Sequence, residues 1–274
     1  MANGIALTIG LNAVDPQHYA GWNGKLRACE ADANDMANIA KSKKFQVKTL
    51  LTKEATRANV IEQISKAAQS LKSGDIFMLS YSGHGGQLPD LNRDEADCAD
   101  ETWCLYDGQL VDDEINSLFA KFSAGTRILL FSDSCHSGTV SKGVYYYSKP
   151  RPKDASGEEI SYRLMPADYI IPVYRQNKEF YDKILREPAV KDEDIKASAL
   201  LISGCQDCQY SQDGLINGLF TSQLLDVWKD GKFRGDYKRF YKMICNQMPP
   251  DQTPNYYPTG TKNYKFEYQK PFTV

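Results

Sequence analysis

The sequence lacks the features that mark several classes of protein. No apolar run approaches the length of a membrane span. The first residues carry neither the basic leader nor the small-residue cleavage site of a secretory signal peptide. The 33 basic residues are balanced by 35 acidic ones, a formal net charge of -2, which argues against a nucleic acid as the main partner. These absences predict a cytoplasmic globular protein with no membrane or nucleic-acid partner.

The cysteines do not suggest a disulfide framework. The seven cysteines are an odd number, scattered through a chain too long to need covalent staples, which favours a reducing compartment. Cys205 and Cys208 form a Cys-x-x-Cys pair, and such a pair raises zinc or redox chemistry. A zinc site would need two further ligands at a matching spacing, and the sequence offers none. We therefore interpret this pair as part of a loop.

The composition is that of a globular protein. The 274 residues are 42% hydrophobic and 25% charged, which is enough for one large core. Short apolar runs bounded by turn residues predict buried strands, and apolar residues at helical spacing predict amphipathic helices. The predicted strands are residues 4–11, 45–51, 76–81, 127–132, 198–203 and, at an edge, 264–268. The predicted helices are residues 29–41, 55–71, 176–185, 218–228 and 237–248. This alternation predicts one α/β domain with a parallel sheet.

Two of the predicted strands lead into reactive side chains. Residues 76–81 are followed by Ser-Gly-His-Gly-Gly, with His84 between two glycines. Residues 127–132 are followed by Asp-Ser-Cys-His-Ser-Gly, so Cys135 has polar neighbours and not the apolar ones of a buried structural cysteine. Ligand sites of α/β sheets lie at the carboxyl ends of the strands. A thiol and an imidazole at that edge are the pair that nucleophilic catalysis needs.

These residues resemble the two motifs of the metacaspase branch of the caspase-like cysteine peptidases. Residues 81–85 are similar to its histidine motif and residues 133–138 to its cysteine motif. The resemblance implies a compact bacterial member with a three-layer caspase-like fold, in which helices cover both faces of a mostly parallel sheet of about six strands. It divides the single domain 1–274 into a large-subunit-like part (1–140), a linker-like segment (141–196) and a small-subunit-like part (197–274). It also makes residues 204–213 a loop on the substrate side.

The motifs predict a Cys-His dyad. Cys135 would supply the thiolate, whose pKa a nearby imidazolium lowers, and His84 would protonate the leaving amine. The N–H groups of Gly85 and Cys135 are the natural oxyanion donors. His136 is the rival for the histidine role, but its position next to the nucleophile favours a role in supporting the loop. No third, orienting residue is evident in the sequence.

The residues around the dyad predict a basic substrate. Residues two apart in an extended segment point to the same side, which places Ser82 beside His84 and Asp133 beside Cys135. Caspases proper have a glutamine in the position of Asp133. Cys29 and Asp32 resemble a metacaspase Cys-x-x-Asp that lines the substrate pocket. An acidic pocket binds Arg or Lys and repels the acidic residue that caspases accept. In the alternative interpretation, Asp133 caps nearby amides and Asp32 is a favourable charge at a helix N-terminus.

Residues 87–114 are rich in carboxylates, and two interpretations remain open. One is a solvated loop followed by the acidic start of a helix at residue 115. The other is a calcium site, because some metacaspases bind calcium through residues that resemble Asp100, Asp112 and Asp113. The position of the family's further ligand falls on Lys142, and a lysine repels calcium. We expect no cofactor to be required for the chemistry.

The sequence therefore supports a cysteine endopeptidase that hydrolyses protein or peptide substrates after Arg or Lys. Residues 139–196 contain many Lys and Arg positions, so self-cleavage there could activate a zymogen. The alternative is a catalytically silent or partner-activated scaffold that signals by contact. A monomer is expected.

Overall fold

A central sheet of six strands organises the molecule. The computed structural model describes residues 2–92, 99–134, 161–205, 211–214 and 216–274. The strands lie in the order β2-β1-β3-β7-β8-β9. Their bounds are Gln46–Leu51 (β2), Gly4–Gly10 (β1), Ile76–Ser82 (β3), Arg127–Asp133 (β7), Ser198–Ser203 (β8) and Asn255–Gly260 (β9). The first five pair in parallel and β9 pairs with β8 in antiparallel. The predicted mostly parallel sheet is confirmed.

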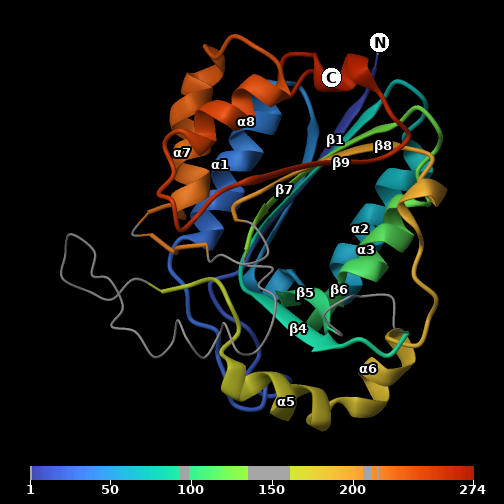
Figure 1. The fold of residues 1–274 in the computed structure, drawn as a ribbon, viewed down its shortest axis with the longest axis vertical. Helices are drawn as coiled ribbons and strands as arrows, with labels where there is room; N and C mark the ends of the chain where they lie inside the picture. Colours follow the sequence, from blue (N-terminus) through green and yellow to red (C-terminus); the bar gives the residue numbers. More distant parts are fainter. Residues whose placement is uncertain (1, 93–98, 135–160, 206–210, 215) are drawn as a thin grey trace.

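Helices cover both faces of this sheet and complete the three layers (Figure 1). On one face lie α1 (Cys29–Ser42), α7 (Leu219–Trp228) and α8 (Tyr237–Cys245); on the other lie α2 (Arg57–Ser70) and α3 (Asp112–Phe119). Successive side chains of β7 serve the two faces in turn, as expected for a strand. Ile128 and Leu130 pack in the cluster with α2 and α3, whereas Leu129 and Phe131 pack in the cluster with α1, α7 and α8.

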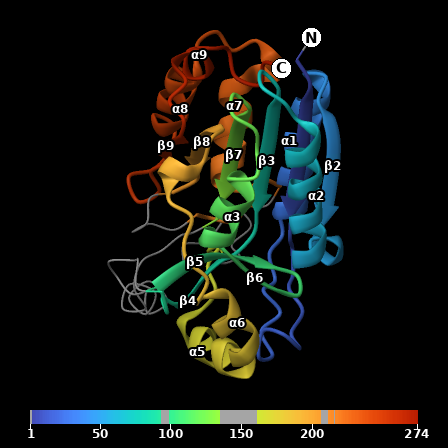
Figure 2. The ribbon, with the colours of Figure 1, turned by 90° about the vertical axis from the view of Figure 1, so that its right-hand side faces the viewer.

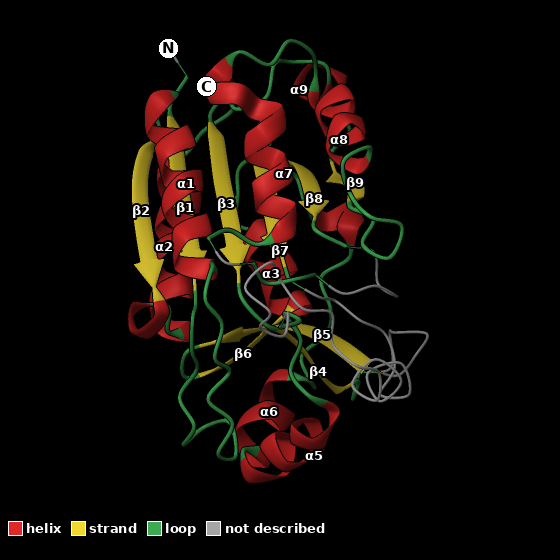
Figure 3. Ribbon diagram, turned by 90° about the vertical axis from the view of Figure 1, so that its left-hand side faces the viewer, coloured by secondary structure: helices red, strands yellow, loops and turns green. Residues whose placement is uncertain are grey.

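A second, smaller layer lies toward the carboxyl ends of the parallel strands. In Figure 3 the arrows of β2 and β3 point to the end of the molecule where β4, β5 and β6 lie. These three strands form an antiparallel sheet and span Gly85–Pro89, Ala99–Leu105 and Gly108–Val111. Helices α5 (Ala167–Gln176) and α6 (Lys178–Ile184) lie beyond them (Figure 2). This layer forms one wall of the edge where His84 and Asp133 emerge.

The small sheet corrects the prediction of a solvated loop over residues 87–114. Asp100 and Trp103 on β5 are both 2% exposed, and Trp103 stacks on Tyr81 with ring centroids 4.4 Å apart. The prediction was wrong because we took the density of carboxylates as a sign of solvation. A segment rich in carboxylates can still form a strand when its apolar residues, here Trp103, Cys104 and Leu105, are buried.

The C-terminal edge also differs from the prediction. Residues 264–268 are not a strand; α9 spans Tyr264–Glu267, and the Asn263 side chain accepts a hydrogen bond from the Phe266 N–H at its start. Tyr264 and Tyr268 are 64% and 68% exposed, so the apparent alternation does not bury one face. The edge strand is β9, whose Pro258 is tolerated because an edge strand needs only one row of ladder hydrogen bonds.

Short 3-10 helices connect several of these elements. They span Thr52–Glu54, Asp192–Asp194 and Lys229–Gly231. Among the helices of the described residues, none combines the length and apolar character needed to span a bilayer.

Leu129→Ala tests how strongly the sheet depends on its buried face. Leu129 is fully buried in β7, so truncation leaves a cavity and should lower the free energy of unfolding by about 2–5 kcal/mol. Urea denaturation measures the change. Ile216→Ala is the control, because Ile216 is 75% exposed and its truncation should alter stability by less than about 0.5 kcal/mol. Equal effects of the two substitutions would contradict the packing described here.

Candidate functional site

The register of the central strands brings the predicted site residues to one edge. Ser82 is the last residue of β3 and pairs with Asp133, the last residue of β7. Asp32 lies in the first turn of α1, which packs on β1 and β3. The Ser82 hydroxyl donates to Asp32 Oδ2 over 2.7 Å. The structure therefore brings together Asp32, Ser82 and Asp133, as the sequence predicted.

An arginine that the sequence analysis missed fills the pocket between these residues. Arg163 is 0% exposed, and its Nη2 lies 2.7 Å from Asp32 Oδ2 and 3.0 Å from Asp213 Oδ1. Its Nη1 lies 2.9 Å from Asp133 Oδ2 and donates to Ser82 Oγ, also over 2.9 Å. Asp213, likewise missed, completes the ring of three carboxylates around the guanidinium. In the sequence, both Arg163 and Asp213 lie in segments that we assigned to loops, and this was the only feature that could have pointed to a functional role.

Hydrogen bonds from α7 and the turn before it hold two of the carboxylates. Asp32 Oδ1 accepts from the Gly218 N–H and from Asn217 Nδ2, both over 3.0 Å. Asp133 Oδ2 accepts from the Thr221 N–H over 3.1 Å and from its hydroxyl over 2.7 Å. These donors at the N-terminal end of α7 favour negative charge. Two carboxylates of the pocket are thus held in place by hydrogen bonds from a regular helix and the turn before it.

The electrostatics of the cluster keep the arginine charged. Burial alone would lower the pKa of Arg163, but the charges of Asp133, Cys29, Asp32 and Asp213 raise it well above its usual value. Burial raises the pKa of the Asp32 carboxyl, and the guanidinium opposes this shift. Three carboxyl groups face one guanidinium, so the lining of the pocket is acidic.

The main chain around Arg163 is hydrogen-bonded on both sides. The Arg163 N–H donates to the Ser211 carbonyl over 3.0 Å, and the Asp213 N–H donates to the Ser161 carbonyl over 2.8 Å. The Gly85 N–H donates to the Arg163 carbonyl over 2.9 Å, and the Met165 N–H returns a bond to the Gly85 carbonyl over 2.8 Å. Extended segments that add to neighbouring strands in this way are a common mode of peptide binding.

His84 lies beside this segment in a dry environment. The side chain is buried, its Nε2 is 3.1 Å from the Gly24 carbonyl oxygen, and its ring centroid is 4.7 Å from that of Trp22. Burial lowers the pKa of His84 to about 3, and the hydrogen bond with the Gly24 carbonyl partly opposes this. Among the described residues, Nδ1 has no hydrogen-bond partner. The imidazole is therefore neutral while Arg163 occupies the pocket.

Several predicted residues lie outside this geometry. Cys135, His136 and Lys142 fall outside the described residues. Cys29 is buried at the start of α1, and burial raises the pKa of its thiol. It is a wall of the pocket and not a second nucleophile, because a reactive cysteine needs a lowered pKa.

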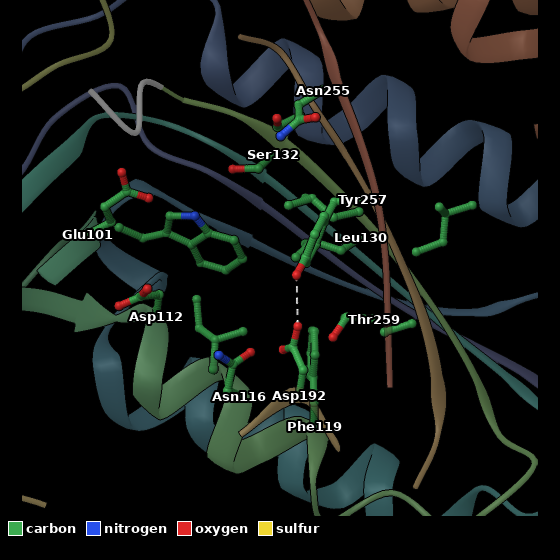
Figure 4. A pocket seen from close by; sticks show the side chains of 16 residues that line it. Glu101, Asp112, Asn116, Phe119, Leu130, Ser132, Asp192, Asn255, Tyr257 and Thr259 are labelled. Atoms are coloured by element: carbon green, nitrogen blue, oxygen red, sulfur yellow. Dashed lines mark hydrogen bonds between the residues drawn. The ribbon is translucent and has the colours of Figure 1, made fainter. Parts of the chain in front are cut away.

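The predicted calcium ligands belong to β5 and to the first turn of α3. Asp112 opens α3 and lines, with Glu101, one side of a cavity of about 310 Å³ (Figure 4). On its far side Tyr257 donates a hydrogen bond to Asp192 over 2.9 Å. Asp113 accepts one from Asn92 over 3.0 Å, and Asp100 is buried on β5. Within the described ranges, no group of three or more His, Cys, Asp or Glu side chains is arranged to hold a metal ion.

The comparison with known proteins agrees with this architecture. A family model described as the caspase domain matches residues 3–265. This chain belongs to the caspase-domain family. Within it, metacaspases are among the similar proteins. Metacaspase-1 of Coccidioides immitis is 29% identical over 252 residues, covering 80% of this chain and 52% of the relative. Metacaspase-1 of Pyricularia oryzae is 29% identical over 275 residues, covering 89% and 67%. The chain thus spans about half to two thirds of the length of these curated relatives.

Solved structures share the caspase fold of this chain. The crystal structure of protein GSU0716 from Geobacter sulfurreducens is 59% identical, covers 99% of both chains and has a TM-score of 0.91. Caspase-1 from Spodoptera frugiperda is 14% identical, covers 95% of this chain and 88% of its own, and has a TM-score of 0.59. The second likeness concerns the fold alone. The predicted metacaspase-like member of the caspase family, with its caspase-like fold, is confirmed.

The low pKa of His84 predicts a pH-dependent stability. Below about pH 6.5 the unfolded imidazole takes up a proton, whereas the folded one does so only near pH 3. The free energy of unfolding should therefore fall on acidification within this window, by up to about 1.4 kcal/mol per pH unit from this residue. Denaturation of the wild type and of His84→Gln at several pH values measures the difference between the two profiles. A difference that stays constant from pH 7 to pH 4 would contradict the burial of a neutral imidazole.

Proposed function

We propose that this protein is a cysteine endopeptidase that hydrolyses peptide bonds after Arg, and less efficiently after Lys, through Cys135 and His84. The observation that carries the proposal is the ion-paired Arg163 guanidinium, which is fully buried in a pocket of three carboxylates beside His84. The pocket fits a basic side chain whose main chain continues past the imidazole. Membership of the caspase-domain family supports the reaction type.

The contacts of Arg163 explain why a basic residue would precede the cut bond. Both terminal nitrogens are used: Nη1 reaches Asp133 and Nη2 reaches Asp32 and Asp213. A planar fork matches several carboxylates at once, whereas the single nitrogen of a lysine cannot reach both sides of the pocket. An aspartate in the same place would add a fourth negative charge in a buried site. The pocket therefore selects Arg over Lys and rejects acidic residues.

The proposed catalysis uses side chains and main-chain groups of this chain alone. Cys135 gives its thiol proton to His84 as its sulfur attacks the carbonyl carbon. The Gly85 N–H stabilises the oxyanion, and its 2.9 Å bond to the Arg163 carbonyl is the geometric support for this role. The Cys135 N–H is the second proposed donor. His84 donates the proton that the leaving amine needs. No cofactor is required for these steps, and we propose that calcium is not needed either.

The alternative is a protein that stays catalytically silent, or acts only after a partner engages it. The observation in its favour is that the acidic pocket is already occupied by Arg163, so an external substrate has no free pocket to enter. This alternative differs in outcome, because a silent scaffold would hydrolyse no reporter peptide under any condition.

Substitution of the proposed dyad should abolish hydrolysis of a fluorogenic peptide ending in Arg. Cys135→Ala removes the nucleophile and should reduce activity to background. His84→Ala removes the general acid and should lower kcat/KM by about a hundredfold to ten-thousandfold. Cys245→Ala is the matched control, since Cys245 lies on α8, away from the pocket residues, and the variant should keep wild-type activity. Full activity in Cys135→Ala would exclude the proposed nucleophile.

A peptide library digested with and without calcium tests specificity and metal need together. Cleavage should follow Arg, then Lys at about a tenth of the rate, because Lys loses about one charge-assisted hydrogen bond. Peptides ending in Asp or Glu should stay whole, and rates should be equal in calcium and in chelator. Mass spectrometry identifies the cut bonds. Cleavage after Asp, or an absolute need for calcium, would contradict the proposal.

A further inference from the structure

Arg163 is held as a substrate would be held, with its own peptide bond beside His84. Resting on the function proposed above, we propose that the Arg163–Leu164 bond is the first bond this enzyme cleaves. The cleavage occurs within the same molecule, and until then the Arg163 side chain blocks the pocket against other substrates. The Arg163–Leu164 bond is thus a self-processing site that lies in the described part of the linker-like segment.

The main-chain hydrogen bonds distinguish a bound substrate from a structural arginine. A structural arginine needs only partners for its guanidinium. Here the residue's N–H also donates to Ser211 and its carbonyl accepts from Gly85. Beyond the Arg163–Leu164 bond, the Met165 N–H donates to the Gly85 carbonyl, so main-chain hydrogen bonds hold both sides of this peptide bond. The carbonyl oxygen thus sits at the N–H proposed as the oxyanion donor. The next residue, Leu164, pairs in an isolated parallel bridge with Gly85, the neighbour of His84 in the chain.

The pocket wall is shaped to admit the guanidinium. A Cβ built on Gly218 would lie 2.4 Å from Nη2 of Arg163 and 2.5 Å from its Nη1 and Cζ. The backbone of Gly218 has a φ of -60°, which any residue can adopt, so the space and not the conformation requires glycine there. The Gly218 N–H also donates to Asp32 Oδ1. Gly218 therefore lets the guanidinium approach closely and also holds one of the carboxylates that bind it.

The chemical step balances with groups that the chain supplies and one water. As the Cys135 sulfur bonds to the Arg163 carbonyl carbon, the thiol proton passes to the neutral His84 ring. The bond to the Leu164 nitrogen then breaks, and His84 gives that same proton to the nitrogen. Water then attacks the thioester and gives one proton to His84, the bond to sulfur breaks, and His84 returns that proton to the departing Cys135 sulfur. The products are an Arg163 α-carboxylate and a new N-terminus at Leu164.

The two sides of the cut bond are anchored differently. After Leu164 the chain continues into Met165, Ile170 and Val173, which are buried in one hydrophobic cluster and hold the new N-terminus in place. Before it, Arg163 is held chiefly by its ion pairs. The new α-carboxylate adds negative charge beside three carboxylates and weakens that hold. Cleavage should therefore free the arginine side while the Leu164 side stays docked.

A time course of the purified wild-type chain tests the proposal directly. Intact mass and N-terminal sequencing should find one early cut that creates an N-terminus at Leu164. The fraction cut per minute should not change over a hundredfold dilution, because the reaction is intramolecular. Hydrolysis of an Arg-ending reporter should begin with a lag that matches the appearance of the cut. An early cut at another bond, or a rate that falls in proportion to dilution, would overturn the inference.

Variants separate the block from the cut. Arg163→Ala should hydrolyse the reporter at once, without a lag and with residues 163 and 164 still joined. Arg163→Lys should still be cut there, more slowly by about tenfold, since it keeps the cation but loses part of the fork. Arg175→Ala, a change of an exposed arginine on α5, is the matched control and should behave as the wild type. If Arg163→Ala does not fold, the position of the cut in the wild type and the cleavage rate of Arg163→Lys still test the proposal.

The outcomes also separate this inference from the proposed function. If the wild type hydrolyses the reporter at full rate while its chain stays whole, the self-processing site is wrong and the peptidase stands. If Arg163→Ala is active and the wild type is silent and uncut, the block is supported and cleavage at this bond is excluded. If neither folded protein hydrolyses Arg-ending peptides, the proposed function itself fails.

Discussion

The buried pairing of one guanidinium with three carboxylates is the interaction on which the site depends. A charge removed from water is strongly unfavourable unless it is matched, and each partner here is at most 3% exposed at its side chain. The pairing joins α1, the end of β7, the residues before α5 and the segment before α7. Loss of either sign of charge would leave the other buried without a partner. Each of the four charged residues is therefore needed to keep the others buried.

The sheet makes this pairing possible. Parallel strands end at a common edge, so Ser82 and Asp133 meet through strand register although they are far apart along the chain. The N-terminal end of α7 reaches the same edge and supplies hydrogen bonds to Asp32 and Asp133. The small sheet then contributes Gly85, whose N–H faces the carbonyl of the bound arginine. A scaffold of regular elements thus fixes a site whose occupant comes from an irregular segment.

The fold is shared by a chain of very different sequence. Caspase-1 from Spodoptera frugiperda shares the fold at 14% identity. The fold fixes the strand edge, and the residues placed on that edge set which side chain is recognised. In this chain the edge carries carboxylates, which is the opposite charge to that needed for an acidic substrate residue. In the proposed function, substrate specificity depends on a few side chains at strand and helix ends and not on the core.

The sequence by itself determined the central sheet, the main helices and the meeting of Asp32, Ser82 and Asp133. Hydrophobic periodicity marks strands and helices, and parallel strands bring their ends together. It did not reveal Arg163, Asp213 or the small sheet. Arg163 lies 131 positions from Asp32, and nothing local distinguishes a buried arginine from the many exposed basic residues around it. Only the tertiary structure decided which cation the carboxylates hold, because a buried charge is placed by partners from distant segments and not by its neighbours in the chain.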